Sequence, residues 1–136
     1  MTPRTVPALD TVGYHAAAGL VANGAAALAA MGVELLARSG VPRDAATHML
    51  GPLLRSVAEN VERLGFPSAL TGPVRRGDPV AVRKHLALLE ERLPEAVPLF
   101  VASGLAQLPL ARALEEAPPS GFDAIEAVLR GSGSSR

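Results

Sequence analysis

Two groups of polar residues in this chain have types and spacing that could do chemistry. The first group is His15 with Asn23, which lie eight residues apart in a predicted helix with Gly19 between them. In an α-helix, this spacing places two side chains two turns apart and about 80° around the axis. An imidazole and an amide on either side of the open space above a glycine could bind or protonate a small polar ligand. The alternative, which the residue types alone favour, is that local hydrogen bonds satisfy both side chains.

The second group lies in the segment L-T-G-P-V-R-R-G-D at residues 70–78. Thr71 and the backbone N–H groups after it, together with Arg75 and Arg76, could hold a carboxylate or a phosphate. The alternative, again favoured, is a structural turn in which Asp78 only caps the next helix. His85 follows on that helix and is a further candidate for acid–base chemistry.

Several kinds of site are absent from the sequence. There is no cysteine, which excludes disulfides, zinc–thiolate sites and a cysteine nucleophile. The histidines His15, His48 and His85 fall on three different predicted helices, so no metal site is expected. No G-x-G-x-x-G, Walker or H-E-x-x-H motif and no nucleophile elbow is present. We therefore expect this chain alone to bind neither a dinucleotide cofactor nor a nucleoside triphosphate.

The composition indicates one small globular domain. The chain has 136 residues, of which 49% are apolar and only 3% aromatic. Its 13 basic and 13 acidic residues balance, which disfavours nucleic-acid binding. Residues 16–33 form an apolar stretch just long enough to span a membrane, but its Ala/Gly-rich composition favours a buried central helix. No apolar leader is evident at the N-terminus, and we expect a cytoplasmic protein without a membrane partner.

Proline, glycine and capping residues predict an all-α fold of about five helices around a long, central first helix. Residues 1–130 are expected to form one domain with an N-terminal extension over 1–10, and residues 131–136 a disordered Gly/Ser tail. Pro109 is expected to kink or break the fourth helix. The predicted helices cover 11–39, 42–64, 79–92, 94–116 and 122–130, with a long loop over 66–78.

Two features of the predicted helices concern packing. The first helix contains four glycines, which weaken it and predict close backbone contact along one face; they are Gly13, Gly19, Gly24 and Gly32. The second helix carries an apolar stripe at helical spacing; it consists of Leu50, Leu53, Leu54, Val57 and Val61.

Three stretches of the chain resemble a known family. They are Y-H-A-A-A at residues 14–18 followed by Asn23, A-L-T-G-P-V-R-R-G-D-P-V-A-V-R-K-H-L at residues 69–86, and A-Q-L-P-L-A at residues 106–111. The chain is similar, over about residues 11–113, to the helical C-terminal domain of Rossmann-like proteins of uncharacterised function. These proteins are relatives of the 6-phosphogluconate dehydrogenase superfamily.

The resemblance implies a helical domain that follows an NAD(P)-binding Rossmann domain, binds substrate in the cleft between the two domains and forms the dimer. On that basis His15, Asn23, Thr71, Arg76 and His85 would face the cleft. His15 or His85 would donate the proton that accompanies hydride transfer, and the other three would position the substrate.

The chain departs from that family pattern in two respects. It lacks the Rossmann half, so a hydride donor could be bound only by a Rossmann subunit acting in trans. Its first helix also lacks the lysine, with an asparagine one turn later, that hydroxyacid dehydrogenases of the wider superfamily use, so their mechanism does not carry over.

Three hypotheses follow. The leading one is the substrate-binding and dimerisation domain of an NAD(P)-dependent oxidoreductase. The second is a stand-alone, cofactor-free enzyme, an isomerase, dehydratase or cyclase, that uses His15, His85 and Asn23. The third is a homodimeric interaction module without a ligand.

Overall fold

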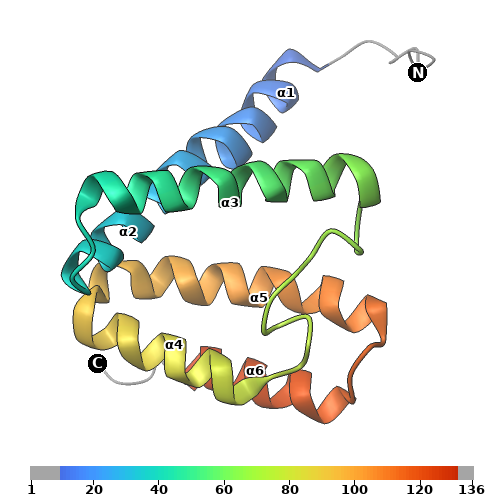
Figure 1. The fold of residues 1–136 in the computed structure, drawn as a ribbon. Coiled ribbons are helices and arrows are strands. Elements are labelled where there is room, and N and C mark those ends of the chain that lie inside the picture. Colours follow the sequence, from blue (N-terminus) through green and yellow to red (C-terminus); the bar gives the residue numbers. More distant parts are fainter. Residues whose placement is uncertain (1–9, 132–136) are drawn as a thin grey trace.

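The computed structural model describes residues 10–131, and within them the regular structure is entirely helical (Figure 1). The elements α1 (Thr11–Ala18), η1 (Gly19–Asn23) and α2 (Gly24–Arg38) are continuous, so residues 10–131 contain five helical rods, which confirms the all-α prediction. Residues 1–9 of the predicted extension and 132–136 of the predicted tail lie outside the described residues. The elements are α1 (Thr11–Ala18), the π-helical turn η1 (Gly19–Asn23), α2 (Gly24–Arg38), α3 (Arg43–Leu64), α4 (Pro79–Arg92), the 3-10 turn η2 (Pro94–Ala96), α5 (Val97–Leu114) and α6 (Pro119–Gly131).

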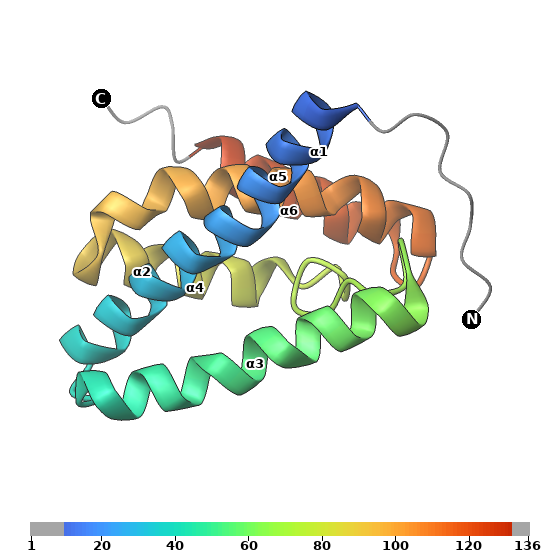
Figure 2. The same ribbon diagram turned by 90° about the horizontal axis from the view of Figure 1, so that it is seen from above.

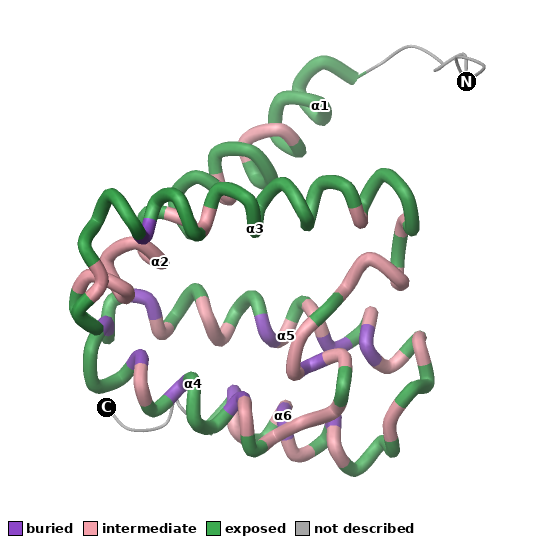
Figure 3. The backbone as a smooth tube through the Cα atoms, in the orientation of Figure 1, coloured by how far each residue is buried: buried purple, intermediate pink, exposed green. Residues whose placement is uncertain are grey.

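The main hydrophobic core lies among α4, α5, α6 and the loop before α4. On α6, the buried residues Phe122, Ile125 and Leu129 recur at helical spacing and so form one face. In Figure 3, most of the buried positions lie in these three helices. We call α4–α6 the bundle. Its buried cluster consists of Val74, Val82, Leu108, Ala111, Phe122, Ile125 and Leu129.

The first two rods form a separate hairpin that meets the bundle mainly at one end. Gly32 lets α2 approach α3 closely, because a Cβ at this position would lie 2.9 Å from Cδ1 of Leu50. Met31 and Leu35 of α2 pack on a second buried cluster formed by Leu89, Leu93 and Ala96. From this junction α1 projects away from the bundle, and α2 and α3 diverge (Figures 1 and 2).

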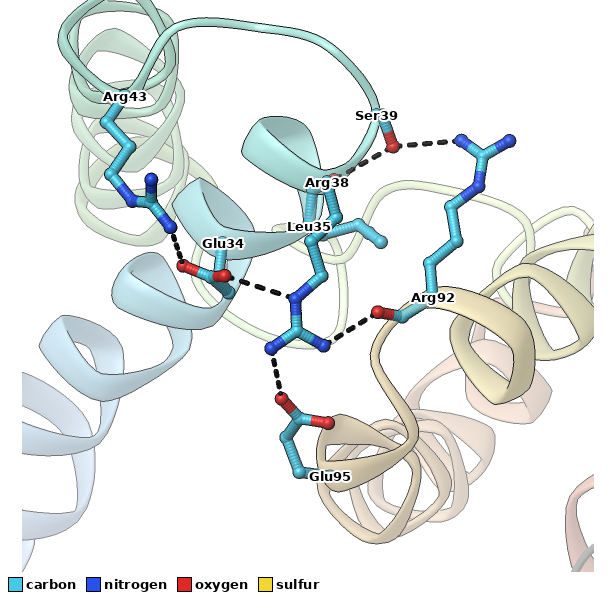
Figure 4. A network of polar contacts seen from close by, with 7 residues as sticks. All are labelled: Glu34, Leu35, Arg38, Ser39, Arg43, Arg92 and Glu95. Carbon is cyan, nitrogen blue, oxygen red and sulfur yellow. Dashed lines mark hydrogen bonds and ion pairs between the residues drawn. The ribbon is translucent and has the colours of Figure 1, made fainter.

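A polar network reinforces this junction (Figure 4). Arg38 donates from Nη1 to the carbonyl oxygen of Arg92 at 2.8 Å and pairs through Nη2 with Glu95 at 2.9 Å. Its Nε donates to Glu34 at 3.1 Å, and Arg43 pairs with the other oxygen of Glu34 at 2.8 Å. The Arg43 and Arg38 guanidinium groups hold the pKa of the Glu34 carboxyl below its ordinary value. One planar guanidinium with several fixed donors can thus join three segments.

The expected central position of the first helix is wrong. The rod Thr11–Arg38 has 28 residues, and its most apolar window has a mean hydropathy of 1.7 with none of it buried. A second apolar helix, Pro94–Leu114, has a mean hydropathy of 1.4 and is 17% buried over the corresponding window. By length and composition both could cross a membrane, although this is weak evidence. The sequence predicted an apolar helix correctly, but residues 10–131 do not cover that helix as a central position would require.

Proline positions also differ from expectation. Pro109 lies inside α5 without ending the helix, which continues to Leu114. Leu108 and Ala111 on either side are buried in the bundle core, so tertiary packing holds the helix together where local propensity would end it. The helix α3 likewise contains Pro52, and α6 begins at Pro119, three residues before its predicted start.

The close approach of the loop to α6 yields a stability prediction. A Cβ at Gly121 would lie 2.5 Å from the backbone carbonyl oxygen of Gly77, so Gly121→Ala must displace the backbone. We expect this substitution to reduce the free energy of unfolding by about 1–3 kcal/mol, as overpacking does. Urea denaturation followed by circular dichroism measures the change.

The matched control is Gly51→Ala in α3, where a Cβ has no neighbour within 4 Å. There we expect an increase of up to about 1 kcal/mol from improved helix propensity. Equal midpoints for Gly121→Ala and the unsubstituted chain would show that the loop does not press on α6.

Candidate functional site

The loop between α3 and α4 is held in place by Arg75. Its Nη1 donates to the carbonyl oxygens of Ser68 at 2.8 Å and Leu70 at 2.6 Å. Its Nε and Nη2 donate to the two carboxylate oxygens of Glu116 at 3.0 and 2.9 Å. This two-point pairing ties the loop to the segment between α5 and α6, and together with the two carbonyl contacts it uses four of the five N–H donors of Arg75.

The two adjacent arginines therefore differ in their contacts. Arg76 and Thr71 are both exposed, and no hydrogen bond or ion pair of either side chain occurs within residues 10–131. Asp78 accepts from the backbone N–H of Ala81 at 3.1 Å, which confirms its role as the N-cap of α4. The turn is thus structural at Arg75 and Asp78, while Arg76 and Thr71 remain available to a ligand.

A cavity of about 100 Å³ lies directly beneath this loop. His85 of α4 and Gln107 of α5 supply its side-chain polar groups, and the rest of its wall is mostly apolar. Gln107 donates from Nε2 to the hydroxyl oxygen of Ser103 at 3.0 Å, which leaves its Oε1 atom to accept a hydrogen bond. The lining residues are Pro73, Val74, Val82, His85, Phe100, Gly104, Gln107 and Leu129.

His15 and Asn23 lie elsewhere, on the projecting part of the first rod. The His15 ring stands edge-on to Tyr14 with their centroids 5.7 Å apart, and both residues are exposed. Asn23 ends the π-helical turn, and its Nδ2 lies 3.8 Å from the position that a Cβ on Gly19 would take. The amide thus lies close to the glycine as its spacing predicted. Single π-helical turns inside α-helices occur frequently at functional sites.

The five candidate residues thus fall into two sets. His85 lines the cavity from α4, whereas Thr71 and Arg76 lie on the preceding loop, whose Pro73 and Val74 form part of the cavity wall. His15 and Asn23 lie on a rod whose α1 part makes no substantial contact with the bundle. A single copy of the chain therefore does not bring the two sets together. The roles of the five residues in catalysis or binding stay predictions.

Two residues of this region were not predicted from the sequence. Gln107 could have been found, because it and Ser103 are polar residues four apart in a helix that is apolar from Val97 to Ala111 apart from these two. Glu116 could not have been found, since nothing local links it to Arg75 41 positions earlier. Among residues 10–131, no group of three or more histidines and acidic residues is arranged to hold a metal ion.

The fold and the site define a small all-α domain that carries a histidine-edged cavity and a projecting apolar rod. This chain belongs to the family described as "Domain of unknown function (DUF2520)", whose model matches residues 1–106. The matched segment includes all five candidate residues and ends one position before Gln107. No curated protein and no solved structure matches the chain.

The clamp on the loop should be sensitive to acid. The Arg75 guanidinium holds the pKa of Glu116 below its ordinary value of 4.5. Because the folded pKa is lowered, the clamp stabilises the protein fully above pH 4.5 and loses its effect as pH falls through the folded pKa. We expect Glu116→Gln to have a lower Tm than the unsubstituted chain at pH 7, with the difference vanishing in acid.

Thermal denaturation over a pH series measures this difference. Glu91→Gln is the control, since the Glu91 side chain is exposed and forms no ion pair in the part of the chain that the structure describes. A Tm difference for Glu116→Gln that persists unchanged at low pH would contradict the charge-based account of the clamp.

Proposed function

We propose that this chain is the substrate-binding and dimerisation domain of an NAD(P)-dependent oxidoreductase of the wider 6-phosphogluconate dehydrogenase type. The observation that carries the proposal is the cavity edged by His85 and Gln107 beneath the loop that bears Thr71 and Arg76. A mostly apolar wall with a few polar groups is the lining typical of a small-molecule site, and the volume of about 100 Å³, below the ~300–1,000 Å³ of drug-sized sites, limits what the cavity can enclose to a small group. The resemblance of residues 69–86 to the Rossmann-linked helical domains supports the same assignment.

The residues of this chain do not fit the dinucleotide itself. Residues 10–131 contain no strand followed by a glycine-rich phosphate loop, the arrangement that holds a pyrophosphate in Rossmann domains. The cofactor would belong to a Rossmann unit, in a longer protein or in a separate subunit. This chain would contribute substrate binding and proton transfer.

The arrangement supports a division of roles within the cavity. The His85 imidazole would donate a proton to the substrate oxygen, a role for which histidine is suited near neutral pH. Arg76 and Thr71 would bind a carboxylate or phosphate of the substrate, because their side chains are exposed on the loop whose Pro73 and Val74 line the cavity. The Oε1 atom of Gln107 would accept from a substrate hydroxyl or amine, and the apolar wall admits only a small carbon skeleton.

The structure favours one of the other two hypotheses and not the other. For the cofactor-free enzyme, His15 and Asn23 would have to work with His85. They lie on α1 and η1, which make no substantial contact with α4, so no observation favours this hypothesis. The interaction module is favoured by the exposed apolar first rod. In the leading proposal, His15 and Asn23 join the site only if assembly brings a first rod to the cavity.

Ligand binding tests the proposal. We expect a small carboxylic or phosphorylated acid to raise the Tm of the chain while NAD(P)H alone does not. A ligand present at 100 times its Kd adds about 2.7 kcal/mol of stability, which a thermal-shift assay detects readily. His85→Ala and Arg76→Ala should each abolish the shift.

The control variant is His48→Ala, because His48 is exposed on α3 and its ring bonds only to the Asp44 carbonyl at 2.7 Å. This variant should keep the full shift. A shift caused by NAD(P)H alone, or one that survives both His85→Ala and Arg76→Ala, would overturn the proposed role of the cavity.

A further inference from the structure

A second cavity, larger than the one at His85, lies between α2 and the bundle. It holds about 190 Å³, and its wall comes from α2, α4, η2 and α5. Among the residues that line it, which include Met31, Leu89 and Leu99, only Ser103 has a side-chain hydroxyl and none is charged. We call it the apolar cavity, and we call the cavity lined by His85 and Gln107 the histidine cavity.

The same two helices line both cavities, in matching order. The helices α4 and α5 run antiparallel and are joined by the short turn η2 (Figure 1). On α4, His85 lines the histidine cavity, and Leu89, one turn later, lines the apolar cavity. On α5 the order is reversed, with Leu99 in the apolar cavity and Gln107 in the histidine cavity. The two cavities therefore follow one another along the seam between α4 and α5.

Phe100 separates the two cavities. Of the residues that line them, Phe100 alone belongs to both walls, and it packs against both buried clusters. A hydrogen bond spans the same boundary, because Gln107 in the histidine cavity donates to Ser103 in the apolar cavity at 3.0 Å. Since Phe100 is half-buried, a change of its side-chain rotamer would connect the cavities. From Phe100 to Gln107 the axis of α5 rises only about 10 Å, which is within the reach of one ligand.

The volumes of the two cavities also favour a shared ligand. The histidine cavity alone, at about 100 Å³, is below the ~300–1,000 Å³ of drug-sized sites, whereas the two cavities together come to the lower end of that range. An apolar cavity of roughly 150 Å³ is large enough to bind benzene. The apolar cavity, at about 190 Å³, can therefore hold a phenyl ring or a chain of about six carbon atoms.

The charges indicate an anionic group at the histidine end of such a ligand. His85 lies in a stretch of α4, residues 79–89, that contains Arg83 and Lys84 but no Asp or Glu. Arg76 on the preceding loop is a further exposed cation. The wall of the apolar cavity, in contrast, offers nothing to pair with a charge. A ligand that occupies both cavities would carry its negative charge near His85 and have an uncharged tail.

We propose that the apolar cavity binds the hydrocarbon tail of the substrate whose head group lies at His85. The substrate class is an amphipathic acid, with an anionic head and a linear or aromatic tail of about six carbon atoms. The inference rests on the proposed function, because it places the head group in the histidine cavity. It goes beyond that function by assigning a tail site, in which Leu89, Leu99 and Phe100 determine the length of chain that binds.

A series of straight-chain carboxylic acids tests the tail site. NMR titration of the ¹⁵N-labelled chain with butyrate, hexanoate, octanoate and decanoate gives the Kd of each acid. We expect the Kd to fall about fourfold for each methylene added up to octanoate, and to change little beyond it. Octanoate should shift the amide signals of Leu89 and Leu99 as well as that of His85, whereas butyrate should shift only that of His85. This readout needs no substitution.

Leu99→Asp tests the wall of the tail site. It places a charge in the apolar cavity only, so it should abolish the dependence on chain length and leave the Kd of butyrate unchanged. Leu54→Asp is the matched control, because Leu54 is 40% exposed against 42% for Leu99 and lines neither cavity. It should keep the dependence on chain length. Octanoate that binds no more tightly than butyrate, or a chain-length dependence that survives Leu99→Asp, would overturn the inference.

Two further results separate failure of the tail site from failure of the proposed function. If butyrate binding requires Arg76 and His85 but all four acids bind equally, the tail site alone fails. The apolar cavity would then be left to a second copy or another subunit. If 1-octanol binds as tightly as octanoate, and both bind Arg76→Ala as tightly as the unsubstituted chain, no head-group site exists. That result would overturn the proposed function and the inference together.

Discussion

The arrangement of this protein depends on the junction at which the helical hairpin meets the bundle. Met31 and Leu35 supply its apolar contact, and the Arg38 guanidinium joins α2 to both Arg92 and Glu95. Beyond this junction the hairpin makes little contact with α4–α6, as Figure 1 shows. The direction in which the first rod and α3 project is therefore determined at one end only. Every surface that the hairpin presents to another molecule inherits its position from this contact.

Local features of the fold could be predicted because their causes are local. Asp78 caps α4 and Pro79 begins it, while Gly40 and Gly65 end the two preceding helices with positive φ values of 97° and 63°. The actual position of the first helix, outside the bundle, could not be predicted. An apolar pattern indicates that a face avoids water, but it does not indicate which segment covers that face. The continuation of α5 past Pro109 could not be predicted for a related reason. The helix is held by buried neighbours that only the tertiary structure reveals.

The candidate site divides in the same way. The loop and His85 were predicted from residue types and from a resemblance, and the structure places both beside one cavity. The different contacts of Arg75 and Arg76 were not predictable, because the ion-pair partner of Arg75 is Glu116, which lies far along the chain. Sequence patterns identify groups that can do chemistry. Which of these groups the fold uses for its own support, and which it leaves to a ligand, depends on contacts between distant segments.

The π-helical turn Gly19–Asn23 has a consequence for the orientation of the rod. The backbone N–H of Gly24 bonds to the carbonyl oxygen of Gly19 five residues back, so the turn acts as one extra residue in an α-helical screw. Each residue of an α-helix turns by about 100°. The turn thus shifts His15 from about 80° away from Asn23 to nearly the same face. Deleting a single residue here would restore a regular α-helix and keep His15 on nearly the same face as Asn23, because seven residues at about 100° turn by about 700°, roughly 20° short of two full revolutions. A further one-residue insertion would instead rotate the preceding segment by about 100° and change which face of α1 meets a neighbouring molecule.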